Sequence, residues 1–186
     1  MYQKNQIPIS GNDADFLEAI YKRHAKQLYF YGLSCCSDID IVEDAIHDVF
    51  IDLCQHQERF EKIRNLKYYL MASLRYTIHQ RLEKEVLSTE LKKEEELEDF
   101  FERDAQDIYI EQEEKAGHMQ IAEDLLSRLT PHQREVIYLR FSEGLSFNKI
   151  AELMTIHRQS AQNLFQQSIN KLRKEISRIS IKNSVK

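Results

Sequence analysis

The amino-acid sequence predicts an all-α protein: two small helical domains joined by an acidic linker, with a helix-turn-helix in the C-terminal domain. Helix-breaking residues are rare, with 4 Gly and 2 Pro in 186 residues, while good helix formers such as Leu, Glu, Lys and Gln abound. Charge is also uneven. Residues 86–120 hold 4 Lys and Arg against 12 Asp and Glu, whereas residues 121–186 hold 11 against 6. These shifts predict domains at 10–85 and 116–180, with a linker at 86–115.

Hydrophobic periodicity predicts four helical segments in the N-terminal domain: three long helices, and a short helix within a polar bend at 58–66. The first covers about residues 13–31, and Gly32 suits its C-terminal exit. Asp38 or Asp40 caps the second, which runs to about residue 57. A polar bend precedes the third, at about 67–85. The expected buried residues are Phe16, Ile20, Leu28, Tyr31, Val42, Ala45, Ile46, Val49, Phe50, Leu53, Tyr69, Leu70, Leu74, Ile78 and Leu82.

The acidic stretch at 86–114 leaves two interpretations open. Low apolar content and repeated Glu are typical of a solvated, partly helical linker, because like charges repel. Alternatively, the stretch masks the basic C-terminal domain until a partner arrives. The sequence favours the linker and does not exclude the mask.

The C-terminal domain, predicted to hold four helices, begins with a helix that includes Ile121, Leu125, Leu126 and Leu129. A clear start signal follows: Thr130 as N-cap, Pro131 at the first helical position, and Gln133 completing a capping box. We expect this second helix to bury Val136, Ile137 and Phe141 and to end at Gly144.

A helix-turn-helix is predicted next. Ser146 caps a helix to Met154, three residues form the turn, and a second helix starts at Arg158. The residues expected on the buried face of this second helix are Ala161, Leu164, Phe165, Ser168, Ile169, Leu172 and Ile176. Its other face carries amides suited to base edges and cations suited to phosphates. The candidate DNA-binding residues are Arg158, Gln159, Ser160, Gln162, Asn163, Gln166, Gln167, Lys171, Arg173 and Lys174.

Three blocks of this sequence, in this order, resemble the extracytoplasmic-function sigma factors, the two-domain subunits that direct bacterial RNA polymerase to promoters. The resemblance covers about residues 13–176. The blocks are residues 40–53, the stretch from Asn65 through Arg81, and the helix-turn-helix with its preceding helix at 129–154. The family implies core RNA polymerase and promoter DNA as partners, and an anti-sigma factor as regulator. A stand-alone helix-turn-helix regulator is the alternative function.

The resemblance implies roles for the first two blocks. In the first, acidic residues at steps of three and four share one helix face, which suits docking on the basic clamp coiled coil of the polymerase; the alternative is an ordinary solvated face. The polymerase-binding candidates are Asp40, Glu43, Asp44, His47, Asp48 and Phe50. In the second, aromatics can stack on exposed bases and cations can follow phosphates. The promoter-melting candidates are Arg64, Asn65, Lys67, Tyr68, Arg75, Tyr76, His79 and Gln80.

Three positions depart from the family pattern. Tyr76 stands where the family commonly has Asn, and Gln80 where it commonly has Asp or Asn. Thr155 replaces the Gly usual in the turn of the helix-turn-helix, where a left-handed backbone is often needed.

The sequence gives no support to an enzyme. Asp44 and His47 make a single carboxylate–histidine pair, whereas helical di-iron proteins need two such motifs and further Glu residues. There is no Gly-rich phosphate loop and no nucleophile elbow. We therefore expect no catalytic residue, metal, cofactor or small-molecule substrate. A module that only sequesters a partner is a further alternative.

The expected compartment is the cytoplasm. The three cysteines are an odd number without a metal or redox pattern, which favours free thiols in a reducing environment. No apolar run approaches the roughly 20 residues of a membrane span, so we expect no direct membrane insertion.

Overall fold

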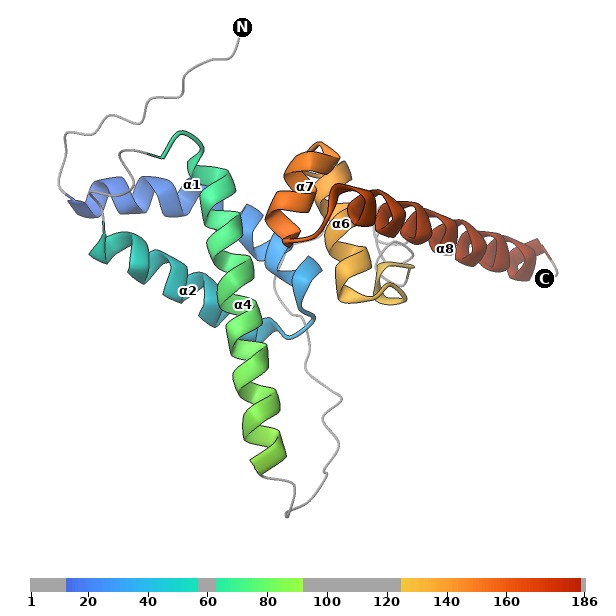
Figure 1. Ribbon diagram of the computed structural model, residues 1–186, viewed down its shortest axis with the longest axis horizontal. Helices are drawn as coiled ribbons and strands as arrows, with labels where there is room; N and C mark the ends of the chain where they lie inside the picture. Colours follow the sequence, from blue (N-terminus) through green and yellow to red (C-terminus); the bar gives the residue numbers. More distant parts are fainter. Residues whose placement is uncertain (1–12, 57–62, 92–124, 185–186) are drawn as a thin grey trace, which may run out of the picture. The chain divides into compact units, whose positions relative to one another are not determined.

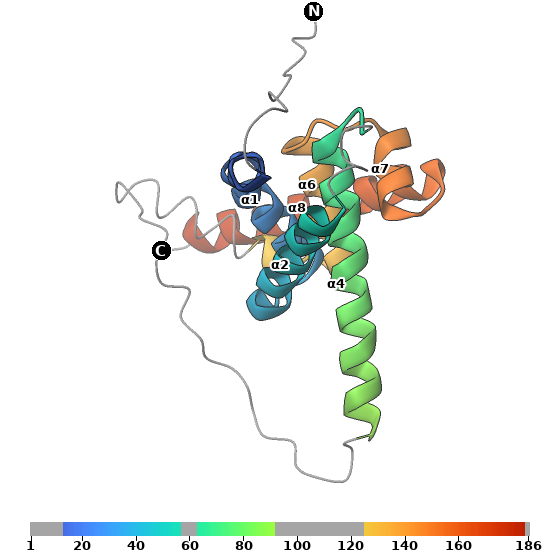
Figure 2. The ribbon, with the colours of Figure 1, turned by 90° about the vertical axis from the view of Figure 1, so that its left-hand side faces the viewer.

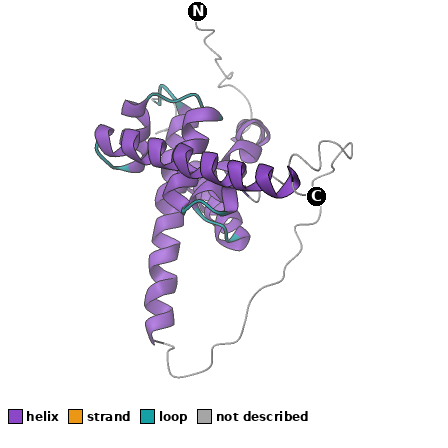
Figure 3. Cartoon of the chain, turned by 90° about the vertical axis from the view of Figure 1, so that its right-hand side faces the viewer, coloured by secondary structure: helices purple, strands orange, loops and turns teal. Residues whose placement is uncertain are grey.

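The computed structural model describes residues 13–56, 63–91 and 125–184. Within these ranges the only regular elements are helices (Figures 1 and 3), which confirms the predicted all-α fold class. The chain divides into two compact units, with the boundary between Glu83 and Lys84. Residues 92–124, which include most of the predicted acidic linker and Ile121, lie outside the described ranges, and so does the side chain of Phe16.

The first unit consists of α1 (Asp13–Cys35), α2 (Ile39–Gln55) and most of α4 (Leu66–Leu91). Asp38 is the N-cap of α2, since its Oδ1 accepts a hydrogen bond from the backbone N–H of Ile41 at 3.1 Å. Asn65 acts similarly before α4, where its Oδ1 accepts from the N–H of Tyr68 at 3.1 Å. Helix α2 returns alongside α1, and α4 crosses this pair (Figures 1 and 2).

Gly32 was expected at the exit of the first helix, and that prediction is wrong. Helix α1 continues to Cys35, and Gly32 lies buried inside it. A Cβ added at Gly32 would lie 2.5 Å from Cγ1 of Val42, which is closer than two carbon atoms can approach. Gly32 is therefore required for the close packing of α1 against α2, since any side chain there would push the helices apart.

The core of the first unit follows the predicted periodicity. Helix α2 buries Ile41 and all six of its predicted residues, from Val42 to Leu53. Helix α4 buries Leu70, Leu74 and Ile78 completely and adds Met71, which the sequence analysis missed. Tyr69 and Leu82 are only half-buried. Helix α4 also runs beyond its predicted end near residue 85, as far as Leu91.

The second unit contains α6 (Pro131–Phe141), α7 (Phe147–Met154) and α8 (Arg158–Ser184), which pack on one another. The predicted capping box is confirmed: the N–H of Gln133 donates to Oγ1 of Thr130 at 3.4 Å, and the N–H of Thr130 donates to Oε1 of Gln133 at 3.2 Å. Helix α6 ends at Phe141, and Gly144 adopts a positive φ of 63° in the turn that follows.

Two residues predicted to be buried in this unit are exposed. Phe141 is 66% exposed, because Leu139 and Glu135 occupy the inward side of α6 instead. Ile176 is 49% exposed. The inward positions of α8 recur every seven residues, at Ala161, Ser168 and Glu175, so the periodic face ends on a carboxylate rather than on the adjacent isoleucine.

Gly32→Ala tests the packing of α1 on α2. In a helix interior this change usually adds about 1 kcal/mol of stability through helix propensity. Here we expect a loss of roughly 1–3 kcal/mol, because the new methyl overpacks against Val42. Adding Val42→Ala removes the obstructing methyls, so the double variant should be less destabilised than the sum of the two single changes. Urea unfolding of the full chain measures all three.

Gly144→Ala is the matched control for this cycle. Nothing lies within 4 Å of a Cβ added there, so its cost comes only from the positive φ. That cost should add to the effect of Val42→Ala without coupling. Stabilisation by Gly32→Ala, or strict additivity with Val42→Ala, would contradict the close-packing account.

Candidate protein and nucleic-acid interfaces

Helix α2 presents a continuous acidic surface. The five polar candidates on it are all exposed, as their common face predicts: Asp40, Glu43, Asp44, His47 and Asp48. The opposite side of the helix packs on the core through Val42, Val49 and Leu53. Burial of that side forces the acidic side chains outward, where a partner can reach them. We call these five residues the acidic face.

Phe50 does not belong to this exposed surface. It is 9% exposed, because its position shares the buried side of α2 with Ile46 and Leu53. Its ring centroid lies 5.0 Å from that of Tyr21 on α1. Tyr21 and Ile51 are instead the exposed large apolar residues beside the acidic face, and the sequence analysis missed both. Periodicity could have found Ile51, which falls on the outward side, but not Tyr21, which comes from another helix.

A cluster of ionic hydrogen bonds joins the acidic face to α4. Arg81 donates through Nε and Nη2 to Oδ2 of Asp48, at 3.1 and 2.6 Å, and through Nη1 to Oδ2 of Asp44, at 2.8 Å. These bonds raise the pKa of Arg81, the hydrogen bond with Asp48 being the main cause. The guanidinium therefore stays charged at any pH at which the protein is folded.

The promoter-melting candidates lie along the first part of α4 and just before it. Four of them are exposed: Arg64, Asn65, Tyr76 and Gln80. Four are half-buried: Lys67, Tyr68, Arg75 and His79. Tyr76 is the most prominent, since 64% of it is exposed. Asn65 serves as the cap of α4, so its side-chain oxygen is engaged by the backbone.

The two family departures on α4 contact each other. Nε2 of Gln80 donates a hydrogen bond to the hydroxyl oxygen of Tyr76 at 2.7 Å, one helical turn away. This bond orients the tyrosine ring while leaving it open to solvent and keeps the hydroxyl proton available for donation. An oriented, exposed aromatic ring is a suitable surface for stacking a base.

His24 belongs neither to the acidic face nor to the promoter-melting candidates. It is buried in α1, and burial lowers its pKa, with Arg23 and Lys67 lowering it further. The imidazole is therefore neutral at neutral pH.

In the described ranges, no group of three or more His, Cys, Asp or Glu side chains could hold a metal ion. Nor does any helix in those ranges have the length and apolarity that crossing a membrane requires.

The helix-turn-helix forms as predicted. Ser146 caps α7, since its Oγ accepts from the N–H of Lys149 at 3.4 Å. Thr155 then takes a left-handed backbone, with φ 57° and ψ 43°, although it carries a β-branched side chain. The N–H of the next residue, Ile156, donates to the carbonyl of Ala151 at 3.0 Å and closes the turn. The turn thus has the glycine-like geometry that the sequence pattern suggested.

Helix α8 exposes its amides and cations. The candidate residues that are exposed are Arg158, Gln159, Ser160, Asn163, Gln166, Gln167, Arg173 and Lys174, while Gln162 and Lys171 are half-buried. Two amide pairs run along the surface: Gln159 donates to Asn163 at 3.1 Å, and Gln166 donates to Asn170 at 3.2 Å. Paired amides retain donors and acceptors that can face base edges.

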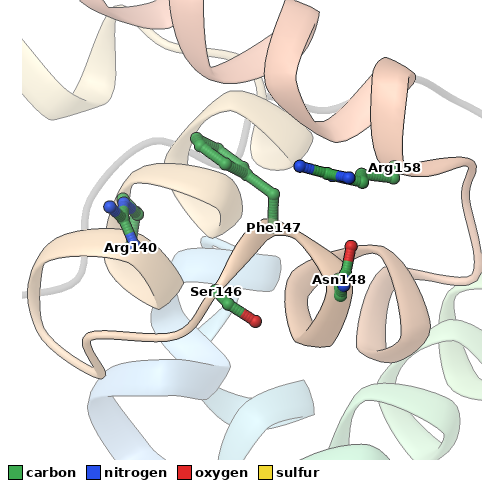
Figure 4. Close-up of a pocket in the computed structure, with 5 residues that line it drawn as sticks. All are labelled: Arg140, Ser146, Phe147, Asn148 and Arg158. Atoms are coloured by element: carbon green, nitrogen blue, oxygen red, sulfur yellow. The ribbon is translucent and has the colours of Figure 1, made fainter.

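An open pocket of about 210 Å³ lies where α6, α7 and α8 meet. Arg140 and Arg158 flank the ring of Phe147, and Ser146 and Asn148 complete the lining (Figure 4). The Arg140 guanidinium lies 5.1 Å from the centroid of the Phe147 ring, a cation–π contact. Sequence reasoning did not connect Arg140 or Asn148 to binding, because the pocket draws on three helices.

The chain matches two family models. Sigma-70 region 2 matches residues 20–86, and Sigma-70, region 4 matches residues 125–174. Among solved structures it is similar to the sigma factor RpoE in complex with the anti-sigma factor NepR from Bartonella quintana, with 21% identity and a TM-score of 0.65 over 88% of this chain and 97% of that chain. This likeness is one of fold. A structure of the RsbN–BldN complex matches at 18% identity and a TM-score of 0.33, over 87% of this chain and 91% of that chain. No curated protein matches.

Proposed function

Because the chain belongs to the extracytoplasmic-function sigma factors of the sigma-70 family, we propose that its two helical units divide the steps of transcription initiation between them. The protein binds core RNA polymerase and directs promoter-specific initiation. We assign docking and promoter melting to residues 10–85, with α4 continuing to Leu91, and upstream recognition to residues 116–180. Residues 86–115 serve as the linker. The factor acts by binding alone, without chemistry of its own, and works in the cytoplasm.

The observation that carries this assignment is an acidic face on α2 and a cationic, amide-rich face on α8 within one chain. A basic protein surface complements the first, and DNA complements the second. A stand-alone helix-turn-helix regulator needs only the second face, and a match to sigma-70 region 2 argues against it. An anti-sigma factor is a further proposed partner, of the kind seen with the similar sigma factor RpoE.

We propose that the acidic face docks on the polymerase. Asp44 and Asp48 already engage Arg81, so changing them alters the contacts between helices as well as the charge. Glu43 is the better probe, since it is exposed and makes no hydrogen bond or ion pair with another described residue. Tyr21 and Ile51 extend the docking surface with exposed apolar area.

Glu43→Lys should weaken binding to core polymerase at least about tenfold, because it sets a cation against a basic partner. Glu83→Lys is the matched control. It makes the same charge change at an exposed position on α4, two residues after Arg81 and so about half a turn around that helix from it, and it should change the affinity less than about twofold. Fluorescence titration of labelled factor with core enzyme measures both. Equal losses from the two variants would mean that the effect is nonspecific charge and not this face.

We propose that Tyr76 stacks on a base of the opened strand. Its ring is exposed and is oriented by Gln80. Nearby cations on the same helix, among them Arg75, supply positive charge for the displaced backbone. The departure from the family's Asn at this position then replaces amide hydrogen bonding by stacking area.

Tyr76→Ala should weaken strand opening by roughly 1–3 kcal/mol, the range for one lost base–aromatic stack. Tyr76→Phe is the matched control, because it keeps the ring and loses only the bond to Gln80. It should open promoters nearly as well as the unaltered protein. Permanganate footprinting reports opening, and gel shifts of the closed complex confirm that binding before melting is intact. If both variants open DNA normally, the stacking role is wrong.

We propose that α8 reads the upstream promoter element. Its N-terminal half, with Arg158 and Gln162, enters the major groove, as recognition helices do. Lys171, Arg173 and Lys174 lie further along and contact phosphates. Arg140 and Asn148 beside the pocket add phosphate contacts near the start of α7.

The two sets of residues on α8 should behave differently. Arg158→Ala or Gln162→Ala should reduce discrimination at particular bases by roughly 1–3 kcal/mol. Arg173→Ala or Lys174→Ala should weaken all sequences alike and lower the salt dependence by about one unit of slope per lost phosphate contact. Titrations on matched and mismatched promoters at two salt concentrations separate these outcomes. A uniform loss from Gln162→Ala would remove it from the base-reading set.

A further inference from the structure

We propose that Arg81 is a positioning residue for polymerase docking: it holds Asp44 and Asp48 of the acidic face in a fixed orientation, ready for the partner. This inference rests on the proposed docking function of α2. It adds a residue from α4 that makes no contact with the partner in this scheme and acts only through the two carboxylates.

The geometry is that of a fork bridging two acids. The three donors of Arg81 reach only one oxygen of each carboxylate, Oδ2 of Asp44 and Oδ2 of Asp48, at 2.6–3.1 Å. The two acids lie one helical turn apart on α2, and the planar guanidinium spans that separation. A lysine has a single nitrogen without this planar fork, so it could not reproduce the same set of bonds.

The contact leaves the acids available. The side chains of Asp44 and Asp48 remain 67% and 47% exposed, whereas that of Arg81 is 30% exposed. Within the described residues, neither Oδ1 atom has a hydrogen bond, so each carboxylate keeps one oxygen for a partner's cation. Two carboxylates and one guanidinium still carry a net negative charge, and the adjacent Glu43 is exposed.

Positioning matters because docking must otherwise restrict two mobile side chains. Ordering a side chain at an interface costs binding free energy, and a bond made beforehand removes part of that cost. The positive charge of Arg81 also offsets part of the negative charge on Asp44 and Asp48 that would attract a basic partner. Electrostatics alone therefore predicts that removing Arg81 tightens docking, whereas positioning predicts that docking weakens. The sign of the effect distinguishes the two.

The test measures the affinity of the full-length protein for core polymerase. Arg81→Gln should weaken binding about three- to tenfold, the loss expected when one or two side chains are no longer pre-ordered. Arg81→Lys keeps the charge and should recover only part of the affinity. Lys84→Gln is the matched control: it removes the same charge from an exposed position on α4, and it should leave the affinity unchanged or slightly tighter. Circular dichroism checks the helix content of each variant.

A mutant cycle ties the effect to the two acids. In an Asp44→Asn/Asp48→Asn background, Arg81→Gln should have no further effect on affinity. Binding by Arg81→Gln that equals or exceeds that of the unaltered protein overturns the inference, as does a loss that persists in this background. If Arg81→Gln reduces helix content, the Arg81→Lys arm decides in the same way, with full affinity as the overturning result. If the double Asn variant itself binds normally, the docking face is wrong and the inference falls with it. If the Asp44→Asn/Asp48→Asn variant loses affinity but Arg81→Gln does not, the docking face is supported and the positioning role of Arg81 is wrong.

Discussion

The close approach of α1 and α2 at Gly32 determines how the first unit presents its surface. Because Gly32 has no side chain, Cγ1 of Val42 can lie only 2.5 Å from the position that a Cβ of residue 32 would take. This close contact fixes the rotation of α2 about its own axis. Once Val42 faces inward, the helical period places Val49 and Leu53 inward too. The charged residues between them then have only solvent to face. The acidic face is therefore a consequence of how one glycine packs, and not only of its own composition.

A buried carboxylate has the corresponding role in the second unit. Glu175 lies on the inward side of α8 and accepts ionic hydrogen bonds from Arg128 at 2.7 Å and from Arg178 at 2.6 Å. A buried charge without partners would be costly, so the two arginines stabilise this carboxylate, and Arg128, which lies outside α8, also helps to fix the rotation of that helix. Ala161 and Ser168 share the same side. The exposed side, with its amide pairs, is thereby fixed toward solvent and available to DNA.

Local signals in the sequence predicted much of this fold, whereas contacts between distant residues were beyond them. The caps at Asp38, Thr130 and Ser146 were found because each depends on neighbours within three residues. Gly32 was misassigned, since glycine at a helix exit and glycine at a helix crossing look alike without knowledge of the facing residue. Phe141 and Ile176 were misplaced for a related reason: an apolar residue near the edge of a periodic face can fall on either side.

The candidate sites show the same division. Exposure of the acidic face and of α8 followed from periodicity alone, because each is the polar side of an amphipathic helix. Phe50 was predicted both for the interface and for the core, and the structure places its side chain in the core. The bonds from Arg81 join residues more than thirty positions apart, at Asp44 and Asp48, and no single-sequence pattern marks such pairs.

The three departures from the family pattern lie outside the cores. Tyr76 and Gln80 satisfy each other through one hydrogen bond on the surface. Thr155 accepts a left-handed backbone, at a cost of roughly 1–2 kcal/mol, because the helices on both sides of it are packed together. All three substitutions are therefore compatible with the fold, and they lie on or beside the surfaces that we propose bind DNA.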